Sequence, residues 1–217
     1  SGKLYDTYIT LPGTTDEACL GTKNTLQPAL QKPQLLHLTR KYSYIGPAWY
    51  SREIQIPAEW KGKDCILHLE RVLWDTQVWV DGKKVEGHEE SLTTPHKYDL
   101  TSYLHPGKTQ ILTIRVDNRK RYDISTGNLA HAYTNDTQVM WNGILGDMYI
   151  VAEDKARIEN LQLYPDAASH TVKAIITLQN SSEETKQINL NLQKMMANTM
   201  PQPKNRHKQP KDLPSLN

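Results

Sequence analysis

Apolar and polar residues alternate with a period of two along residues 48–56, 64–70 and 110–118. Successive side chains of a β-strand point to opposite faces, so this period predicts strands that bury one face of a sheet. The residues expected to face the core in the second and third stretches are Cys65, Leu67, Leu69, Leu112, Ile114 and Val116. In the first stretch Tyr50, Arg52, Ile54 and Ile56 alternate with Trp49, Ser51, Glu53 and Gln55, and Pro57 ends the strand.

Turn residues join these stretches at defined places. Asp81-Gly82 stands between the apolar runs of residues 78–85, which predicts a type I′ hairpin because glycine adopts positive φ at no steric cost. Residues 99–104 resemble a single helical turn capped by Asp99 or Thr101. Residues 119–141 lack periodicity and are rich in Asn, Asp, Gly and Thr, so a functional loop is expected there before strand character returns at residues 148–152.

A second group of strands follows the first sandwich. Residues 157–163 and 171–179 read as strands, and residues 186–192 would pair with them across a turn at residues 180–184. Two or three strands alone are marginal in water, so they predict the opening of a further sandwich that this chain does not complete. The predicted domains are residues 1–152, residues 153–193 and a tail of residues 194–217.

Charge separates this tail from the rest of the chain. The 217 residues carry a net charge of +2, of which the tail contributes +4, leaving −2 for residues 1–193. That body has no basic field to attract nucleic acid, and no apolar run reaches membrane-spanning length, so neither nucleic acid nor membrane is expected as a partner. Two interpretations of the tail stay open: a disordered, solvated end, or the product of a reading frame lost near Lys194.

Five motifs, in this order and spacing, carry a resemblance to a known family. They are Tyr44-Ile45-Gly46-Pro47-Ala48-Trp49-Tyr50-Ser51-Arg52-Glu53-Ile54-Gln55-Ile56-Pro57, Val78-Trp79-Val80-Asp81-Gly82-Lys83, Tyr98-Asp99-Leu100-Thr101, Ile114-Arg115-Val116-Asp117-Asn118 and Trp141-Asn142-Gly143-Ile144-Leu145-Gly146-Asp147-Met148-Tyr149-Ile150. Over residues 44–152 the set resembles the N-terminal sugar-binding domain of glycoside hydrolase family two, the family of β-galactosidases, β-glucuronidases and β-mannosidases.

The resemblance implies an all-β fold: an antiparallel, galactose-binding-like jelly-roll β-sandwich followed by an incomplete immunoglobulin-like β-sandwich. In that family a TIM barrel with two catalytic glutamates comes next, and loops of the first domain reach over its sugar pocket. The implied partners are therefore a carbohydrate substrate and the downstream immunoglobulin-like and TIM-barrel modules. Residues 119–147 would shape the subsite for the non-reducing sugar.

The resemblance also names a candidate site residue. Asp147 matches the family's Asp in a Gly-Ile-x-x-Asp segment, which in some β-galactosidases touches substrate hydroxyls and a bound cation. A carboxylate accepts hydrogen bonds from two vicinal hydroxyls more strongly than a neutral group. Gly146 stands where an Arg commonly precedes that Asp, so the ion pair usual at this place in the family is in doubt here. The alternative to a binding role is that Asp147 caps or solvates the strand that starts at Met148.

Four further residues complete the substrate-binding candidates: Trp141, Asn142, His131 and Tyr133. Pyranose C–H faces pack on aromatic rings, and rings with polar tips tolerate a wet cleft, although the same aromatics can simply anchor a loop. Trp49 and Trp79 lie inside predicted strands, so core packing is expected for them rather than ligand contact.

Catalytic and cofactor chemistries lack support in the sequence. Glu89-Glu90 cannot form the carboxyl pair of a glycosidase in an extended chain, because neighbouring side chains point to opposite sides. The histidines show no zinc spacing, and there is no phosphate loop, so no metal, cofactor or catalytic residue is expected. Cys19 and Cys65 are either two thiols or one disulfide.

The sequence thus predicts a non-catalytic sugar-binding domain, inactive alone, of a β-galactosidase-like enzyme that hydrolyses O-glycosyl bonds. Two alternatives stay open: a stand-alone lectin-like module and a purely structural accessory domain. The location of the protein is open as well, with a periplasmic or secreted parent favoured.

Overall fold

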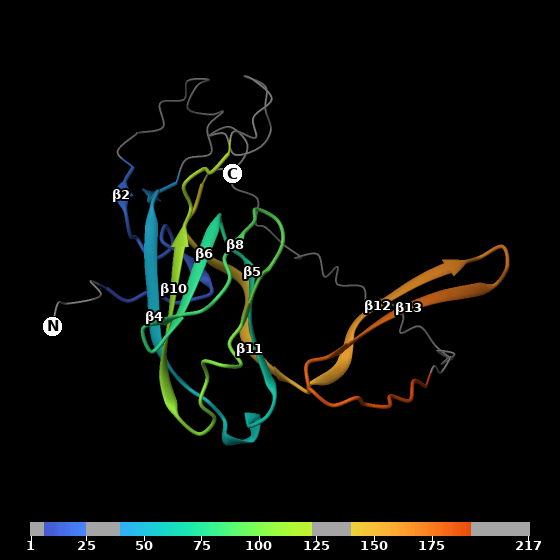
Figure 1. Ribbon diagram of the computed structural model, residues 1–217. Coiled ribbons are helices and arrows are strands. Elements are labelled where there is room, and N and C mark those ends of the chain that lie inside the picture. The colour runs from blue at the N-terminus through green and yellow to red at the C-terminus, as the bar shows by residue number, and fades with distance from the viewer. Residues whose placement is uncertain (1–6, 25–39, 123–139, 192–217) are drawn as a thin grey trace, which may run out of the picture. The chain divides into compact units, whose positions relative to one another are not determined.

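A computed structural model describes residues 7–24, 40–122 and 140–191 of the chain (Figure 1). Within these residues the structure is all-β, with one 3₁₀ turn, η1, at Ala58–Trp60. The strands are β1 (Gly13–Thr14), β2 (Thr22–Lys23), β3 (Tyr42–Ser43), β4 (Pro47–Gln55), β5 (Asp64–Arg71), β6 (Asp75–Val80), β7 (Lys83–Lys84), β8 (Glu89–Glu90), β9 (His96–Asp99), β10 (Thr109–Asp117), β11 (Gly143–Glu153), β12 (Ala156–Asp166) and β13 (Thr171–Asn180). The described part has no helix long and apolar enough to cross a membrane.

The two larger sheets form the antiparallel β-sandwich that the sequence predicted. One has the strand order β1-β11-β5-β9, and the other has the order β4-β10-β6-β7, with β8 also pairing with β6. The chain passes from one sheet to the other between β4 and β5, β5 and β6, β8 and β9, β9 and β10, and β10 and β11. Such crossing connections let the inner faces of both sheets share one core.

Strict alternation places the predicted apolar residues in that core. Leu67 and Leu69 of β5 and Ile114 and Val116 of β10 are at most 1% exposed. Each apolar side chain of this size stabilises the fold by roughly 1.5–3 kcal/mol when fully buried. The strand predictions for residues 48–56, 64–70 and 110–118 are therefore confirmed to within a residue or two at their ends.

The predicted turns are also present. Asp81 and Gly82 have φ of 48° and 77°, and β7 then pairs with β6, as a type I′ hairpin requires. The Leu104 N–H donates to the Leu100 carbonyl, and the Thr101 N–H donates to Oδ1 of Asp99 at 2.9 Å, so Asp99 is the cap of the predicted helical turn.

The expectation that Trp49 and Trp79 pack in the core is wrong. Trp49 is 49% exposed and Trp79 is partly buried, and their ring centroids lie 4.8 Å apart on the outer face of the β4-β10-β6 sheet. The core positions of these strands are taken by Tyr50, Val78 and Val80, so the alternating neighbours must face outward.

Strands β12 and β13 confirm the strands predicted over residues 157–163 and 171–179, and they pair as a two-stranded sheet. Arg157 donates from Nη1 to Oδ2 of Asp64 at 2.8 Å, an ion pair between the start of β12 and the start of β5. Asp64 also accepts a hydrogen bond from Ser181.

The chain divides into one compact unit of residues 1–183 and a second of residues 184–217. In the described part of the second unit, residues 184–191 form no strand, so the strand predicted over residues 186–192 is absent there. An extended segment becomes a strand only with a hydrogen-bonded partner. The domain boundaries at residues 152 and 193 stay predictions, and the tail lies outside the described residues. Cys19 and Cys65 are both free thiols.

Candidate functional site

Several loops meet at one end of the sandwich, which we call the rim. Strands β4, β6 and β11 begin at this end, and β5 and β10 finish there, as their antiparallel registers require (Figure 1). The described residues of the rim include 13–15, 44–47, 70–75, 88–90, 117–122 and 140–147. The described ends of the segment predicted to be a functional loop, residues 119–122 and 140–141, both lie at the rim, whereas residues 123–139 lie outside the described residues.

Two asparagines hold both ends of that segment. Asn118 and Asn142 have no solvent-exposed surface. Oδ1 of Asn118 accepts the Gly46 N–H at 2.8 Å, and Nδ2 of Asn142 donates to the Gly46 carbonyl at 2.9 Å. Tyr50 donates its hydroxyl to Oδ1 of Asn142 at 2.7 Å, and burial raises the pKa of Tyr50, which keeps this donor protonated. The side chain of Asn142 is thus bonded to protein on both of its polar atoms.

Two buried aspartates lie beside these asparagines under a layer of arginines. Asp75 and Asp117 have no exposed surface, and Arg115 bridges them with contacts of 3.0 Å to Asp75 and 2.6 Å to Asp117. Arg119 binds Asp117, and Arg121 contacts Asp75 at 2.6 Å. Hydrogen bonds from Arg119 lower the pKa of Asp117 to about 2, because they outweigh the opposing effect of burial.

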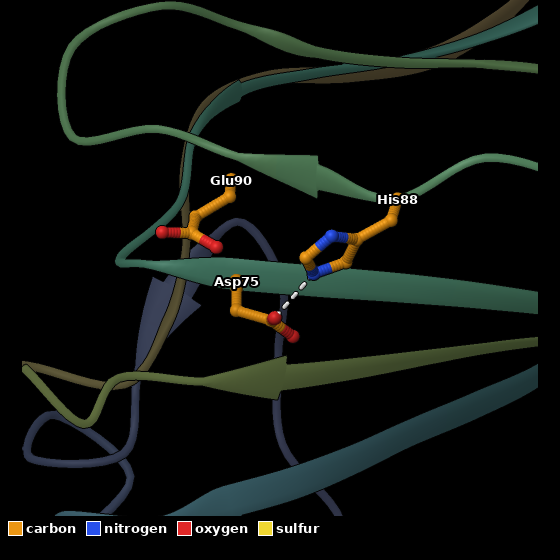
Figure 2. Close-up of side chains that lie close together, drawn as sticks. All are labelled: Asp75, His88 and Glu90. Carbon is orange, nitrogen blue, oxygen red and sulfur yellow. Dashed lines mark hydrogen bonds and ion pairs between the residues drawn. The ribbon is translucent and has the colours of Figure 1, made fainter. Parts of the chain in front are cut away.

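Asp75 also belongs to a group with ligand atoms of metal-binding type. Single ligand atoms of Asp75, His88 and Glu90 all lie within 4.8 Å of one another, and Figure 2 shows His88 directed at the Asp75 carboxylate and the Glu90 carboxylate beside them. The two oxygens of Asp75 already accept bonds from Arg115 and Arg121. Since these guanidinium groups supply the positive charge that a cation would bring, the group fits support of the rim better than metal binding.

Asp147 lies at an irregular point of β11. The register with β5 shifts between Leu145 and Met148, and within this β-bulge Gly146 has φ of 71°. Asp147 is exposed, and its N–H donates to Oε2 of Glu70 at 2.7 Å. Position 146 lacks the arginine that is common there in the family, but the neighbouring strand β5 carries Arg71, which pairs with Leu145 in the strand register. The bulge therefore turns the Asp147 carboxylate toward solvent at the rim.

The remaining predicted site residues divide into two groups. Trp141 is partly buried and directly precedes Asn142 at the start of β11. His131 and Tyr133 lie outside the described residues. The structure thus brings Trp141, Asn142 and Asp147 to the same end of the sandwich, and sugar contact by any of the five stays a prediction.

The arginine-covered aspartates were not expected from the sequence, although a signal was present. Arg115 and Asp117 occupy the outward positions of a strand whose inward positions are Ile114 and Val116. An outward Arg and Asp two residues apart are usual on a solvated face. Only the structure shows that Asp117 pairs with Asp75 at the end of two neighbouring strands and that both are buried there.

Comparison with known proteins decides the family. Residues 7–152 match the sequence profile of glycosyl hydrolases family 2, sugar binding domain. The chain belongs to this family. The matched range covers the whole sandwich and the rim, so the resemblance seen in the five motifs is confirmed.

Curated relatives include two β-galactosidases and a β-glucuronidase. The chain is 28% identical over 118 residues to the β-galactosidase of Thermoanaerobacter pseudethanolicus, covering 52% of this chain and 16% of that protein. It is 30% identical over 120 residues to the β-galactosidase of Priestia megaterium, covering 54% and 10%. It is 24% identical over 152 residues to the β-glucuronidase of Formosa agariphila, covering 66% and 14%. The chain therefore spans only 10 to 16% of the length of these relatives.

Solved structures of β-glucuronidases share the fold. The enzyme of Faecalibacterium prausnitzii superimposes with a TM-score of 0.55 at 21% identity, covering 80% of this chain and 30% of that one. The enzyme of Ruminococcus gnavus gives a TM-score of 0.52 at 17% identity, covering 65% and 25%. At these identities the likeness establishes the sandwich fold of the family-two domain.

Proposed function

We propose that this chain is a non-catalytic sugar-binding domain that holds substrate for a β-galactosidase-like family-two glycoside hydrolase. The observation that carries the proposal is the placement of Asp147, an exposed carboxylate on a β-bulge at the rim of a family-two sandwich. A carboxylate accepts charge-assisted hydrogen bonds from two vicinal hydroxyls of a sugar. Asp147 would therefore fix the orientation of the terminal sugar.

The other site residues take complementary roles. Trp141 would pack its indole against the C–H face of the pyranose, which needs an aromatic ring with one accessible side. Asn142 would act through position rather than contact, since its polar atoms are bonded to Tyr50 and Gly46. His131 and Tyr133 would extend the sugar subsite from the segment whose two ends are held by Asn118 and Asn142.

Hydrolysis is assigned to modules outside this chain. A retaining glycosidase needs two carboxyl groups about 5 Å apart with access to the glycosidic bond. Glu89 and Glu90 follow each other in β8, where neighbouring side chains point to opposite faces, and Asp75 and Asp117 are covered by arginines. An immunoglobulin-like module beginning in β12 and β13, and a TIM barrel after it, would supply the catalytic pair.

The experiment combines a turnover assay with a binding assay on the same chain. The chain of residues 1–217 should not hydrolyse nitrophenyl β-galactoside or nitrophenyl β-glucuronide. Calorimetry should nevertheless detect weak binding of the methyl β-glycoside of one of these two sugars. Trp141→Ala should weaken that binding, and Trp60→Ala, a change in η1 beyond the far end of β4, should not. Turnover by the pure chain would refute the assignment of catalysis elsewhere.

A further inference from the structure

The space over Gly146 is filled by a side chain from the neighbouring strand. A Cβ atom at position 146 would lie 2.5 Å from Cδ of Glu70 and closer still to its Oε2. Gly146 also has φ of 71°, a conformation that residues with a Cβ rarely adopt. Any other residue at position 146 would therefore have to displace Glu70 from the bulge.

Glu70 uses this space to reach the backbone of Asp147. Its Oε2 accepts the Asp147 N–H at 2.7 Å, while its Oε1 lies 3.6 Å from Nε of Arg71. The bond to Asp147 falls where the β5–β11 ladder is interrupted, between Leu145 and Met148. A carboxylate is roughly twice as strong an acceptor for an N–H as a neutral group. One side chain on β5 thus fixes the stretch of β11 from which Asp147 projects.

The neighbouring ring pair makes this arrangement more rigid. His68, two residues before Glu70, stacks on Tyr149, two residues after Asp147, with ring centroids 4.8 Å apart and an angle of 14° between the planes. The regular register resumes at Met148 opposite Leu69. Only residues 146 and 147 of β11 therefore lack a regular strand partner at this point, and the Glu70 carboxylate binds the backbone of the second of them.

We propose that Glu70 is a positioning residue for sugar recognition, which fixes the direction of the Asp147 carboxylate by bonding the Asp147 N–H across Gly146. The proposal rests on the function given above, in which Asp147 contacts a sugar hydroxyl pair. Glycine at position 146 and glutamate at position 70 then act together, since any side chain at position 146 would take the space that the Glu70 carboxylate occupies. The ligand class is a pyranoside that offers two vicinal hydroxyls at its non-reducing end.

The test measures the affinity of methyl β-D-galactopyranoside and methyl β-D-glucuronopyranoside by NMR titration of the full chain. Glu70→Ala and Gly146→Ala should each weaken binding of the better ligand about tenfold, while Glu70→Gln, which keeps an acceptor oxygen, should recover part of the loss. In an Asp147→Asn background, Glu70→Ala should add no further loss, because it acts through Asp147. Glu59→Ala, an exposed glutamate of η1, is the matched control and should bind as the wild type does.

The outcomes separate this proposal from the function on which it rests. Weaker binding by Asp147→Asn together with wild-type affinity in Glu70→Ala overturns the role of Glu70 and leaves the sugar site standing. No binding of either glycoside by the wild-type chain overturns the sugar site and this inference with it. Equal further losses for Glu70→Ala in the wild-type and Asp147→Asn backgrounds also overturn it, because Glu70 would then act independently.

Discussion

The hydroxyl of Tyr50 donates a 2.7 Å hydrogen bond to the side chain of Asn142, joining the core of β4 to the start of β11 across 92 positions of sequence. Both residues are buried, and Asn142 also holds the carbonyl of Gly46. The core and the rim are therefore linked by one polar network, in which each group depends on its partner.

Tyr50→Phe should destabilise the fold by about 1–2 kcal/mol, because it leaves Oδ1 of Asn142 buried without its donor. Urea unfolding at neutral pH measures this difference. Tyr164→Phe is the control, since Tyr164 is 51% exposed on β12 and its loss should change stability by less than about 0.5 kcal/mol. Equal effects of the two changes would show that the Tyr50 hydroxyl does not support the rim.

Asp117→Asn should destabilise the chain by roughly 3 kcal/mol, because Arg115 and Arg119 lose a buried countercharge. Asp154→Asn is the matched control: Asp154 pairs with Lys63 on the surface at 3.4 Å, and such pairs contribute about 0–1 kcal/mol. A variant at position 117 as stable as the control would contradict the role of the arginine layer.

The same aspartate predicts a pH dependence. Its pKa in the folded chain is about 2, below the value of about 3.9 in an unfolded chain. The stabilisation from ionised Asp117 is therefore complete above about pH 4 and is lost as the pH falls toward 2. Urea midpoints measured between pH 2 and 6 should fall less steeply in Asp117→Asn than in the wild type. Parallel curves would assign the acid sensitivity to other carboxylates.

The two kinds of tryptophan should respond differently to truncation. Trp74 is 3% exposed, and Trp74→Ala should cost about 3–5 kcal/mol, as buried aromatic truncations usually do. Trp49→Ala should cost about 1 kcal/mol, because the ring is half exposed and contacts Trp79 on the outer face of the sheet. A large loss at position 49 would mean that the outer sheet face is covered in solution.

Alternation made the sandwich predictable, because buried strand faces need a period of two. The alternation around Leu67 and Ile114 predicts which side of each strand faces the core. The Asp81-Gly82 pair predicts the position and type of the hairpin turn. Trp49 was misplaced because its position inside a predicted strand was taken to favour the core, whereas the alternation of β4 gives the inward position to Tyr50. The partners of Glu70 and Asp75 depend on strand order and on a one-residue bulge, and local sequence does not determine which strands become neighbours.

Sugar binding at the rim around Asp147 can be observed residue by residue. Methyl β-D-galactopyranoside is titrated into isotopically labelled chain while the amide resonances are followed by NMR. We expect saturable shifts confined to residues 141–149 and the adjoining rim, and their loss in Asp147→Asn. Shifts confined to the Trp49–Trp79 face, or no shifts at millimolar sugar, would contradict it.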